Sequence, residues 1–339
     1  MPRQPTPREV FEDLLNRLDP AIREAFESAI RDIQRAVDYQ RLVAEIAAGN
    51  IEAALNSIGI DAAAFEPMLD AIRDAYTESG RATVEGLPRQ VATFRFSARN
   101  YRAEQWLRDH GADLVRQITA DQRLAIREVL EAQTRAGSAP RSIATSVVGR
   151  MNPATGAREG GILGLTRDQA GYVTTARDEL SSGDVARLRN YLQRARRDKR
   201  FDRTVQRAIA DGTPIPADTA RKMVVAYERR LLELRGQTIG RTEAMAAIHE
   251  AQWEALRQAV DAGLIAENQI KRVWRSAGDF RVRDTHRAMN GDSVGLRESF
   301  VSPSGALLRF PGDPQAPISE RANCRCWAET RIDFFANVR

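Results

Sequence analysis

The chain has 339 residues, with 51 Lys and Arg against 46 Asp and Glu, which gives a formal net charge of +5. No window approaches the ~18 apolar residues that span a bilayer, and the first ten residues hold no apolar signal core, so we expect neither a membrane protein nor a Sec-secreted one. Two cysteines exclude a scaffold built on disulfides. Residues 1–80 hold 8 Arg against 15 Asp and Glu (net −7), which leaves +12 for residues 81–339.

The N-terminal part of the chain is predicted to be helical. Thr6-Pro7-Arg8-Glu9 is a helix start, with an N-cap threonine and proline at the first helical position. A second helix is expected over residues 65–77, and the alternation over residues 91–97 predicts a short strand or an extended arm. Between the Thr6 cap and this second helix, one amphipathic stripe at steps of three and four predicts a long helix with an apolar face that needs a packing partner. The stripe consists of Leu14, Leu18, Ile22, Phe26, Ile30, Ile33 and Val37.

Two capping boxes and a glycine-rich segment organise the middle of the chain. The box at residues 119–122 predicts two helices that abut near residue 119. The box at residues 166–169 opens another helix, which extends to about Leu180. Between the boxes, the Gly and Pro residues of 137–164 predict a long loop or hinge around a short helix.

A basic cluster follows, with nine Lys and Arg against two aspartates over residues 187–207. Such a cluster is a phosphate-facing surface or a solvated helix face, and the scarcity of aromatic residues favours the second. The candidates for nucleic-acid contact are Arg194, Arg196, Arg197, Lys199 and Arg200. Downstream, Gly236 and Gly240 are expected to separate a helix through residues 223–234 from another over residues 241–263.

After residue 265 the pattern changes to short strands. Val273-Trp274 is strand-like, and a Ser-Pro-Ser-Gly turn at residues 302–305 predicts a β-hairpin. The expected fold is mainly α, with a long helical N-terminal region and a C-terminal α+β module that contains this hairpin. The expected domains are a helical region at 1–235, with further boundaries near 80–90 and 137–164, the module at 236–330 and a tail at 331–339.

The sequence contains no nucleophile elbow, phosphate-binding loop or His-Glu-x-x-His motif. Of the three histidines, His110 and His249 are interpreted as ordinary surface or packing residues. His286 differs because Asp279 and Arg283 precede it at helical spacing. If this segment is helical, the three share one face and Asp279 pairs with Arg283.

Zinc binding is the first of three interpretations of His286, because Cys324 and Cys326 follow it as soft ligands. The Cys-x-Cys spacing is tighter than in most structural zinc sites, and no closed set of four ligands is evident. The candidates for a fourth ligand are Asp279, Asp284 and Asp313.

Catalysis and a structural role are the other two interpretations. For acid–base chemistry, His286 would act with Arg281 or Arg283 holding a phosphate, but a second proton-transfer group is missing. In the structural interpretation, which we favour, polar side chains hold the module together around two buried, reduced thiols. We therefore expect no enzyme activity, no cofactor and no metal.

An ordered set of residues over 236–330 carries a family resemblance. It consists of Arg241, Glu243, Trp274, Asp279, Arg283, His286, Asn290, Gly291, Phe300, Pro311, Gly312, Asp313, Asn323, Cys324, Arg325 and Cys326. In this order and spacing, the set resembles the Mu F-like minor head proteins of tailed phages, which are head-morphogenesis proteins. The arginine-rich stretch near residue 195 departs from that pattern.

The resemblance implies a virion protein that is made in the bacterial cytoplasm, bound to the portal inside the capsid and needed for head assembly or DNA delivery. Its implied partners are the portal protein and other head proteins, with packaged double-stranded DNA and a second copy of the chain as further candidates. No contact with a membrane is implied. The N-terminal stripe is expected to dock on the portal or on another copy. A DNA-binding protein acting at packaging or ejection is the alternative, and a His286-dependent enzyme on phosphodiesters is the less favoured one.

Overall fold

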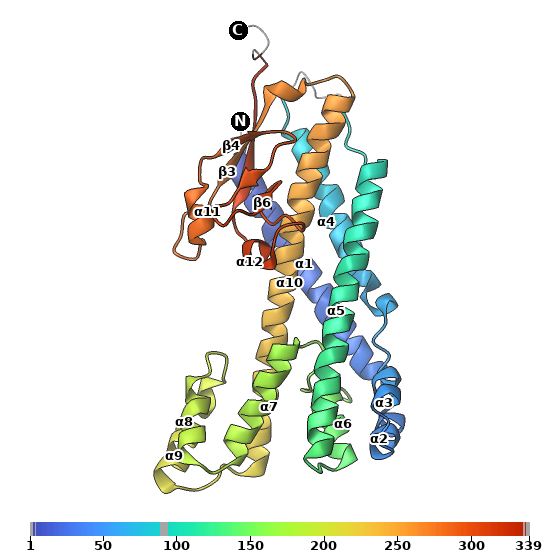
Figure 1. The fold of residues 1–339 in the computed structure, drawn as a ribbon, viewed down its shortest axis with the longest axis vertical. Helices are drawn as coiled ribbons and strands as arrows, with labels where there is room; N and C mark the ends of the chain where they lie inside the picture. The colour runs from blue at the N-terminus through green and yellow to red at the C-terminus, as the bar shows by residue number, and fades with distance from the viewer. Residues whose placement is uncertain (1–2, 4, 89–93, 335, 337–339) are drawn as a thin grey trace. The chain divides into compact units, whose positions relative to one another are not determined.

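The computed structural model describes residues 3, 5–88, 94–334 and 336, and Figure 1 shows its ribbon. Helices dominate as far as residue 261. They are α1 (Pro7–Ala36), α2 (Tyr39–Ala47), α3 (Ile51–Ser57), α4 (Glu66–Glu85), α5 (Tyr101–Arg135), α6 (Pro140–Val148), α7 (Arg167–Ser181), α8 (Val185–Gln193), α9 (Asp202–Asp211) and α10 (Ala217–Asp261). The short elements among them are the 3-10 turns η1 (Ala62–Phe65) and η3 (Lys199–Phe201), and the strands β1 (Arg150–Met151) and β2 (Arg158–Glu159).

Short strands and turns make up the C-terminal segment. In chain order its elements are η4 (Glu267–Gln269), β3 (Ile270–Arg275), α11 (Asp284–Ala288), β4 (Ser293–Gly295), β5 (Phe300–Val301), β6 (Leu307–Leu308), α12 (Ile318–Arg321) and β7 (Trp327–Ile332). A mainly α fold with a C-terminal α+β module is therefore confirmed. Within the part of the chain that the structure describes, no helix combines the length and the hydropathy needed to cross a membrane.

Two compact units make up the fold, and each draws on several segments of the chain. The first comprises the described residues within 1–26, 67–113 and 237–339, and the second those within 27–66 and 114–236. The helices α1, α5 and α10 therefore contribute residues to both units. Residues 237–330 of the predicted module share their unit with helical segments from the N-terminal half, because compactness depends on contacts and not on chain order.

Helix α1 begins and packs as its sequence pattern indicates, but its apolar stripe is already covered. The Glu9 N–H donates to Thr6 Oγ1 (3.2 Å), and the Thr6 N–H donates to the Glu9 carboxylate (2.7 Å), which completes a capping box. All seven stripe residues are buried, and Ile22, Phe26 and Ile30 are 0% exposed. The prediction that this face docks on another protein is therefore wrong, because the folded chain itself covers it.

Two long helices continue through points where the sequence predicted breaks. In α5, Thr119 Oγ1 donates to the Val115 carbonyl (2.9 Å) within one helix, so it does not cap a new one. Helix α10 runs on through Gly236 and Gly240. A β-carbon at Gly240 would lie 2.6 Å from the Asp19 carbonyl oxygen. This glycine therefore permits close packing against Asp19, and it does not end a helix.

Several other local predictions are confirmed. Helix α4 covers the helix expected over 65–77, α6 is the short helix inside the 137–164 loop, and Thr166 caps α7 with a complete capping box. Residues 91–93 of the strand or arm expected over 91–97 lie outside the described residues, and residues 94–97 form no strand.

The C-terminal strands form two small antiparallel sheets. Strand β3 lies at the centre of a three-stranded sheet in the order β4–β3–β7, with Lys271 opposite Gly295 and Trp274 opposite Ala328. Strands β5 and β6 form the predicted hairpin, in which Val301 lies opposite Leu307. These sheets and the loops between them position the polar residues described next.

Candidate functional site

A buried cluster of one imidazole and two thiols lies in the C-terminal module. His286 is on α11, and Cys324 and Cys326 are on the segment between α12 and β7 (Figure 1). His286 Nδ1 lies 3.5 Å from the sulfur of Cys324 and 3.5 Å from that of Cys326. All three side chains are at most 2% exposed, and the Trp274 ring meets the imidazole edge-on at 5.0 Å. The structure thus brings together three residues that lie up to 40 positions apart.

The other face of the imidazole meets a buried carboxylate. His286 Nε2 lies 2.9 Å from Glu320 Oε2, an ion-pair distance at which the N–H direction is not aligned for a hydrogen bond. Three hydroxyl groups donate to the same carboxylate, from Thr285 (3.1 Å), Ser302 (3.2 Å) and Ser304 (2.6 Å). These bonds fix the carboxylate beside the imidazole and compensate for its burial.

The pKa values of the two thiols shift in opposite directions. A hydrogen bond from Cys326 and the neighbouring His286 lower the pKa of Cys324 well below its ordinary value, although burial opposes this shift. The pKa of Cys326 is raised by its interaction with Cys324 and by burial. The two sulfurs therefore interact with each other as well as with His286.

The predicted face of Asp279, Arg283 and His286 does not form. Helix α11 begins only at Asp284, so residues 279–283 are not helical, and Asp279 pairs with Arg325 instead of Arg283. The Arg283 guanidinium donates to the Ala322 carbonyl, directly before the Cys-containing segment. Both residues therefore stabilise that segment, and Arg283 does not pair with Asp279 beside His286.

The expected aspartate ligands also lie elsewhere. Asp284 is exposed and pairs with Arg287, while Asp313 is buried and pairs with Arg309. Within the described residues, His286, Cys324 and Cys326 are the one group of three or more His, Cys, Asp or Glu whose ligand atoms all lie within 4.8 Å of one another.

The Pro-Gly-Asp motif at 311–313 forms a second buried polar network. Arg309 donates to both carboxylate oxygens of Asp313 (2.6 and 3.0 Å) and lies 3.2 Å from Glu250 on α10. Burial raises the pKa of Glu250 to about 7, opposed by the Arg309 charge. Gly312 has φ +81°, and a β-carbon there would lie 3.1 Å from Met245. The glycine thus allows this turn to lie close against α10.

The remaining motif residues also make contacts inside the first unit. Arg241 donates to Asp19 (2.7 Å), and the Glu243 carboxylate lies 2.6 Å from His110 Nε2. The Gly291 N–H donates to the carbonyl of Trp274 (2.9 Å), with a positive φ of 101°. These residues thus contact other parts of the first unit.

Sequence reasoning missed two buried polar residues that fix the sheets. His249 donates from Nδ1 to the Met245 carbonyl (3.0 Å) and accepts the Ala328 N–H at Nε2 (3.3 Å), which attaches β7 to α10. Burial lowers its pKa to about 4. Arg272 on β3 donates to the carbonyls of Gly295, Glu298 and Arg309. A charged residue inside an apolar strand was the available signal for Arg272, and none marked His249.

The basic cluster at residues 187–207, which holds the candidates for nucleic-acid contact, is largely paired with carboxylates. Arg194 pairs with Glu179 (2.7 Å), Arg197 with Asp202 (2.9 Å) and Arg200 with Asp198 (2.7 Å). Arg196 and Lys199 are exposed. The charge of the cluster is therefore reduced by neighbouring carboxylates, one of which, Glu179, could not be recognised as a partner from sequence.

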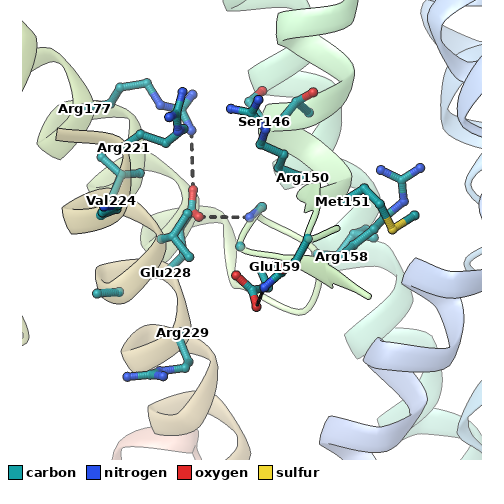
Figure 2. A pocket seen from close by; sticks show the side chains of 18 of the residues that line it. Ser146, Arg150, Met151, Arg158, Glu159, Arg177, Arg221, Val224, Glu228 and Arg229 are labelled. Atoms are coloured by element: carbon teal, nitrogen blue, oxygen red, sulfur yellow. Dashed lines mark hydrogen bonds and ion pairs between the residues drawn. The ribbon is translucent and has the colours of Figure 1, made fainter. Parts of the chain in front are cut away.

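A second concentration of basic residues lines a cavity of about 1660 Å³ in the second unit (Figure 2). Its walls carry four glutamates, one of which is the buried Glu228, whose carboxylate accepts the Gly161 N–H (2.9 Å) and lies 3.4 Å from Arg177. Burial raises the pKa of Glu228 to about 7, against the effect of Arg177. The basic residues among the described lining are Arg31, Arg141, Arg150, Arg158, Arg177, Arg200, Arg221, Lys222 and Arg229.

The C-terminal module is similar to a known family of phage proteins. Residues 199–329 match the family described as Phage Mu protein F like protein, which confirms the resemblance predicted over residues 236–330. The match begins upstream of the predicted module, in the arginine-rich stretch that fitted no recognised motif.

A curated relative matches part of the chain. It is the uncharacterized protein YqbB of Bacillus subtilis (strain 168), which is 31% identical over 102 residues. These residues make up 29% of this chain and 31% of the relative, so the match spans about a third of the length of each protein. No solved structure matches the chain.

Proposed function

We propose that the protein is a structural minor head protein of a tailed bacteriophage, which docks at the portal inside the capsid and acts in head morphogenesis. The observation that carries this proposal is the family match over residues 199–329. The burial of His286 supports a structural role, since this side chain is 1% exposed and has its ring nitrogens against two thiols and Glu320. On this proposal the protein is made in the host cytoplasm, and its partners are the portal and other head proteins.

The β5–β6 hairpin is the docking surface that we propose in place of the buried α1 stripe. Val301 and Leu307 lie directly opposite each other and are 61% and 63% exposed. Their neighbours Phe300 and Leu308 are buried, so the hairpin has one face in the core and an apolar pair on the other. We propose this exposed apolar pair as part of the surface that contacts the portal.

Incorporation into procapsids tests the proposal. Procapsids assembled with the portal should contain this chain, and the double variant Val301→Asp, Leu307→Asp should reduce its copies per procapsid about tenfold or more. Tyr172→Asp is the matched control, because Tyr172 is also an exposed apolar residue (52%) but lies on α7. Absence of the wild-type chain from procapsids and virions would contradict the head-protein role. Normal incorporation of the double variant would contradict only the hairpin as its anchor.

Contact with packaged DNA is a second candidate function, favoured by the nine basic residues that line the cavity of the second unit. Among them, Arg141 and Arg150 are exposed and accessible to a phosphate. If they contact phosphates, Arg141→Ala and Arg150→Ala should each lower DNA affinity and reduce the slope of log affinity against log salt by roughly one. The control variants Arg196→Ala and Lys199→Ala, from the basic cluster at residues 187–207, should change DNA affinity and the salt slope less. Affinity that does not depend on salt would contradict the DNA role.

A further inference from the structure

We propose that His286, Cys324 and Cys326 bind a zinc ion that joins α11 to the segment preceding β7. The metal would have a structural role, because all three side chains are buried and lie within the core of the module. Imidazole nitrogen and thiolate sulfur are the ligands that zinc takes in structural sites.

The spacing of the three atoms fits a tetrahedral zinc ion. With Zn–S bonds of about 2.3 Å and Zn–N bonds of about 2.05 Å, a nitrogen and a sulfur at the tetrahedral angle lie about 3.6 Å apart, and two sulfurs about 3.8 Å apart. His286 Nδ1 is 3.5 Å from each sulfur, and all three ligand atoms lie within 4.8 Å of one another. The two nitrogen–sulfur separations therefore already match those of a bound zinc ion.

A single hydrogen bond from the imidazole does not account for the position of both thiols. One imidazole nitrogen offers either a single lone pair or a single N–H, yet both sulfurs lie at the same distance from Nδ1. A cation at the centre of the three atoms is in contact with both sulfurs and the nitrogen at once. A shared metal therefore explains the symmetric placement of the thiols better than one hydrogen bond does.

The surroundings of His286 resemble those of a metal-bound histidine, in that a carboxylate lies beside its second ring nitrogen. A histidine that ligates through one nitrogen is oriented through the other by a carboxylate or carbonyl. Here the second nitrogen, Nε2, lies 2.9 Å from Glu320 Oε2, and three hydroxyls hold that carboxylate in place. This arrangement points Nδ1 at the two sulfurs and would leave the ring proton on Nε2.

The segment that carries the thiols is held from several sides. Asn323 has a positive φ of 53°, its N–H donates to Thr242 Oγ1 (3.1 Å), and Arg325 pairs with Asp279. These contacts fix the backbone on both sides of Cys324, so the two sulfurs are oriented before a metal arrives. Preorganisation of this kind lowers the cost of binding.

Among the described residues, no further His, Cys, Asp or Glu joins the group of three, so the protein supplies three ligands. A zinc link suits this part of the fold, because α11 and α12 are only five and four residues long and cannot stabilise each other by helix packing.

Metal content of the full chain tests the assignment. Protein produced in medium supplemented with zinc should contain about one zinc ion per chain by elemental analysis after gel filtration. Replacement of zinc by cobalt(II) should produce thiolate-to-cobalt charge-transfer absorption and the visible bands of a tetrahedral site. A folded wild-type chain that binds neither zinc nor cobalt, or that holds another metal under these conditions, would overturn the proposal.

Variants locate the site. Cys324→Ser and Cys326→Ser should each lose the charge-transfer band and most of the zinc, whereas His110→Gln, a histidine variant outside the cluster, should retain both. Glu320→Gln leaves all three ligands in place and should weaken zinc affinity by about 10–100-fold. If the cysteine variants fold but keep the zinc of the wild type, the metal lies elsewhere and the proposal fails.

Discussion

Helix α1 and the C-terminal module bury their residues against different kinds of neighbour. In α1, seven apolar side chains recur at helical spacing and enter an apolar core. In the module, the buried set includes His286, Arg272, Asp313 and Glu320, each held by polar contacts. Apolar packing is non-directional and tolerates small shifts, whereas polar networks must satisfy every buried donor and acceptor. Helix α1 should therefore respond to changes in volume, and the module to changes in charge and hydrogen bonding.

The largest expected effect is a loss of volume in the helical core. Phe26→Ala should lower the free energy of unfolding by about 3–5 kcal/mol, because Phe26 is completely buried. Phe280→Ala removes the same atoms at a position that is 86% exposed, so it should change the free energy of unfolding by less than about 0.5 kcal/mol. Denaturant titrations followed by circular dichroism measure both. Equal effects of the two variants would contradict the burial assigned to α1.

Buried charge in the second unit predicts a pH dependence. The pKa of Glu228 is about 7 in the fold against an ordinary value of 4.5, so the folded state holds this proton more tightly than the unfolded state. The contribution of Glu228 to stability is therefore complete below pH 4.5 and is lost as the pH rises to about 7, by about 3 kcal/mol. Glu228→Gln should remove this part of the pH dependence.

Comparison of the wild type with Glu228→Gln isolates the contribution of the Glu228 carboxylate. Glu250 in the first unit also has a pKa raised to about 7, so both wild type and Glu228→Gln should retain its contribution. The difference between their unfolding free energies should change between pH 4.5 and 7 and be constant above. A constant difference throughout would mean that the pKa of Glu228 is the same in the folded and unfolded states.

A smaller effect is expected from a change of charge without a change of volume in the module. Asp313→Asn keeps the shape of the side chain but removes the charge that accepts from Arg309, so unfolding free energy should fall by roughly 1–3 kcal/mol. Thermal and denaturant unfolding measure this loss. Unchanged stability would show that the module, like α1, depends mainly on apolar packing.

The smallest effect is expected at the hairpin. Val301→Asp and Leu307→Asp place charges at exposed positions and should each change stability by less than about 0.5 kcal/mol. The same variants should reduce incorporation into procapsids on the proposed function. A large loss of stability would instead mean that this apolar pair belongs to the core of the module.

The local elements of this protein follow from its sequence. The cap at Thr6, the stripe from Leu14 to Val37, the capping box at Thr166 and the hairpin turn at residues 302–305 all depend on near neighbours in the chain. Such signals are short-range, so they can be recognised from the sequence without a structure. The family resemblance was likewise carried by the order and spacing of residues, and it is confirmed over the module.

Only the tertiary structure decided which residues meet. It placed Asp279 beside Arg325 and not Arg283, put Glu320 and its hydroxyl donors beside His286, and attached β7 to α10 through His249. It also covered the α1 stripe with the chain itself and used Gly240 for close packing where the sequence predicted a break. These pairings join residues dozens to hundreds of positions apart. Spacing along the chain specifies a helix face or a turn, but it cannot specify which distant side chain will satisfy a buried polar group.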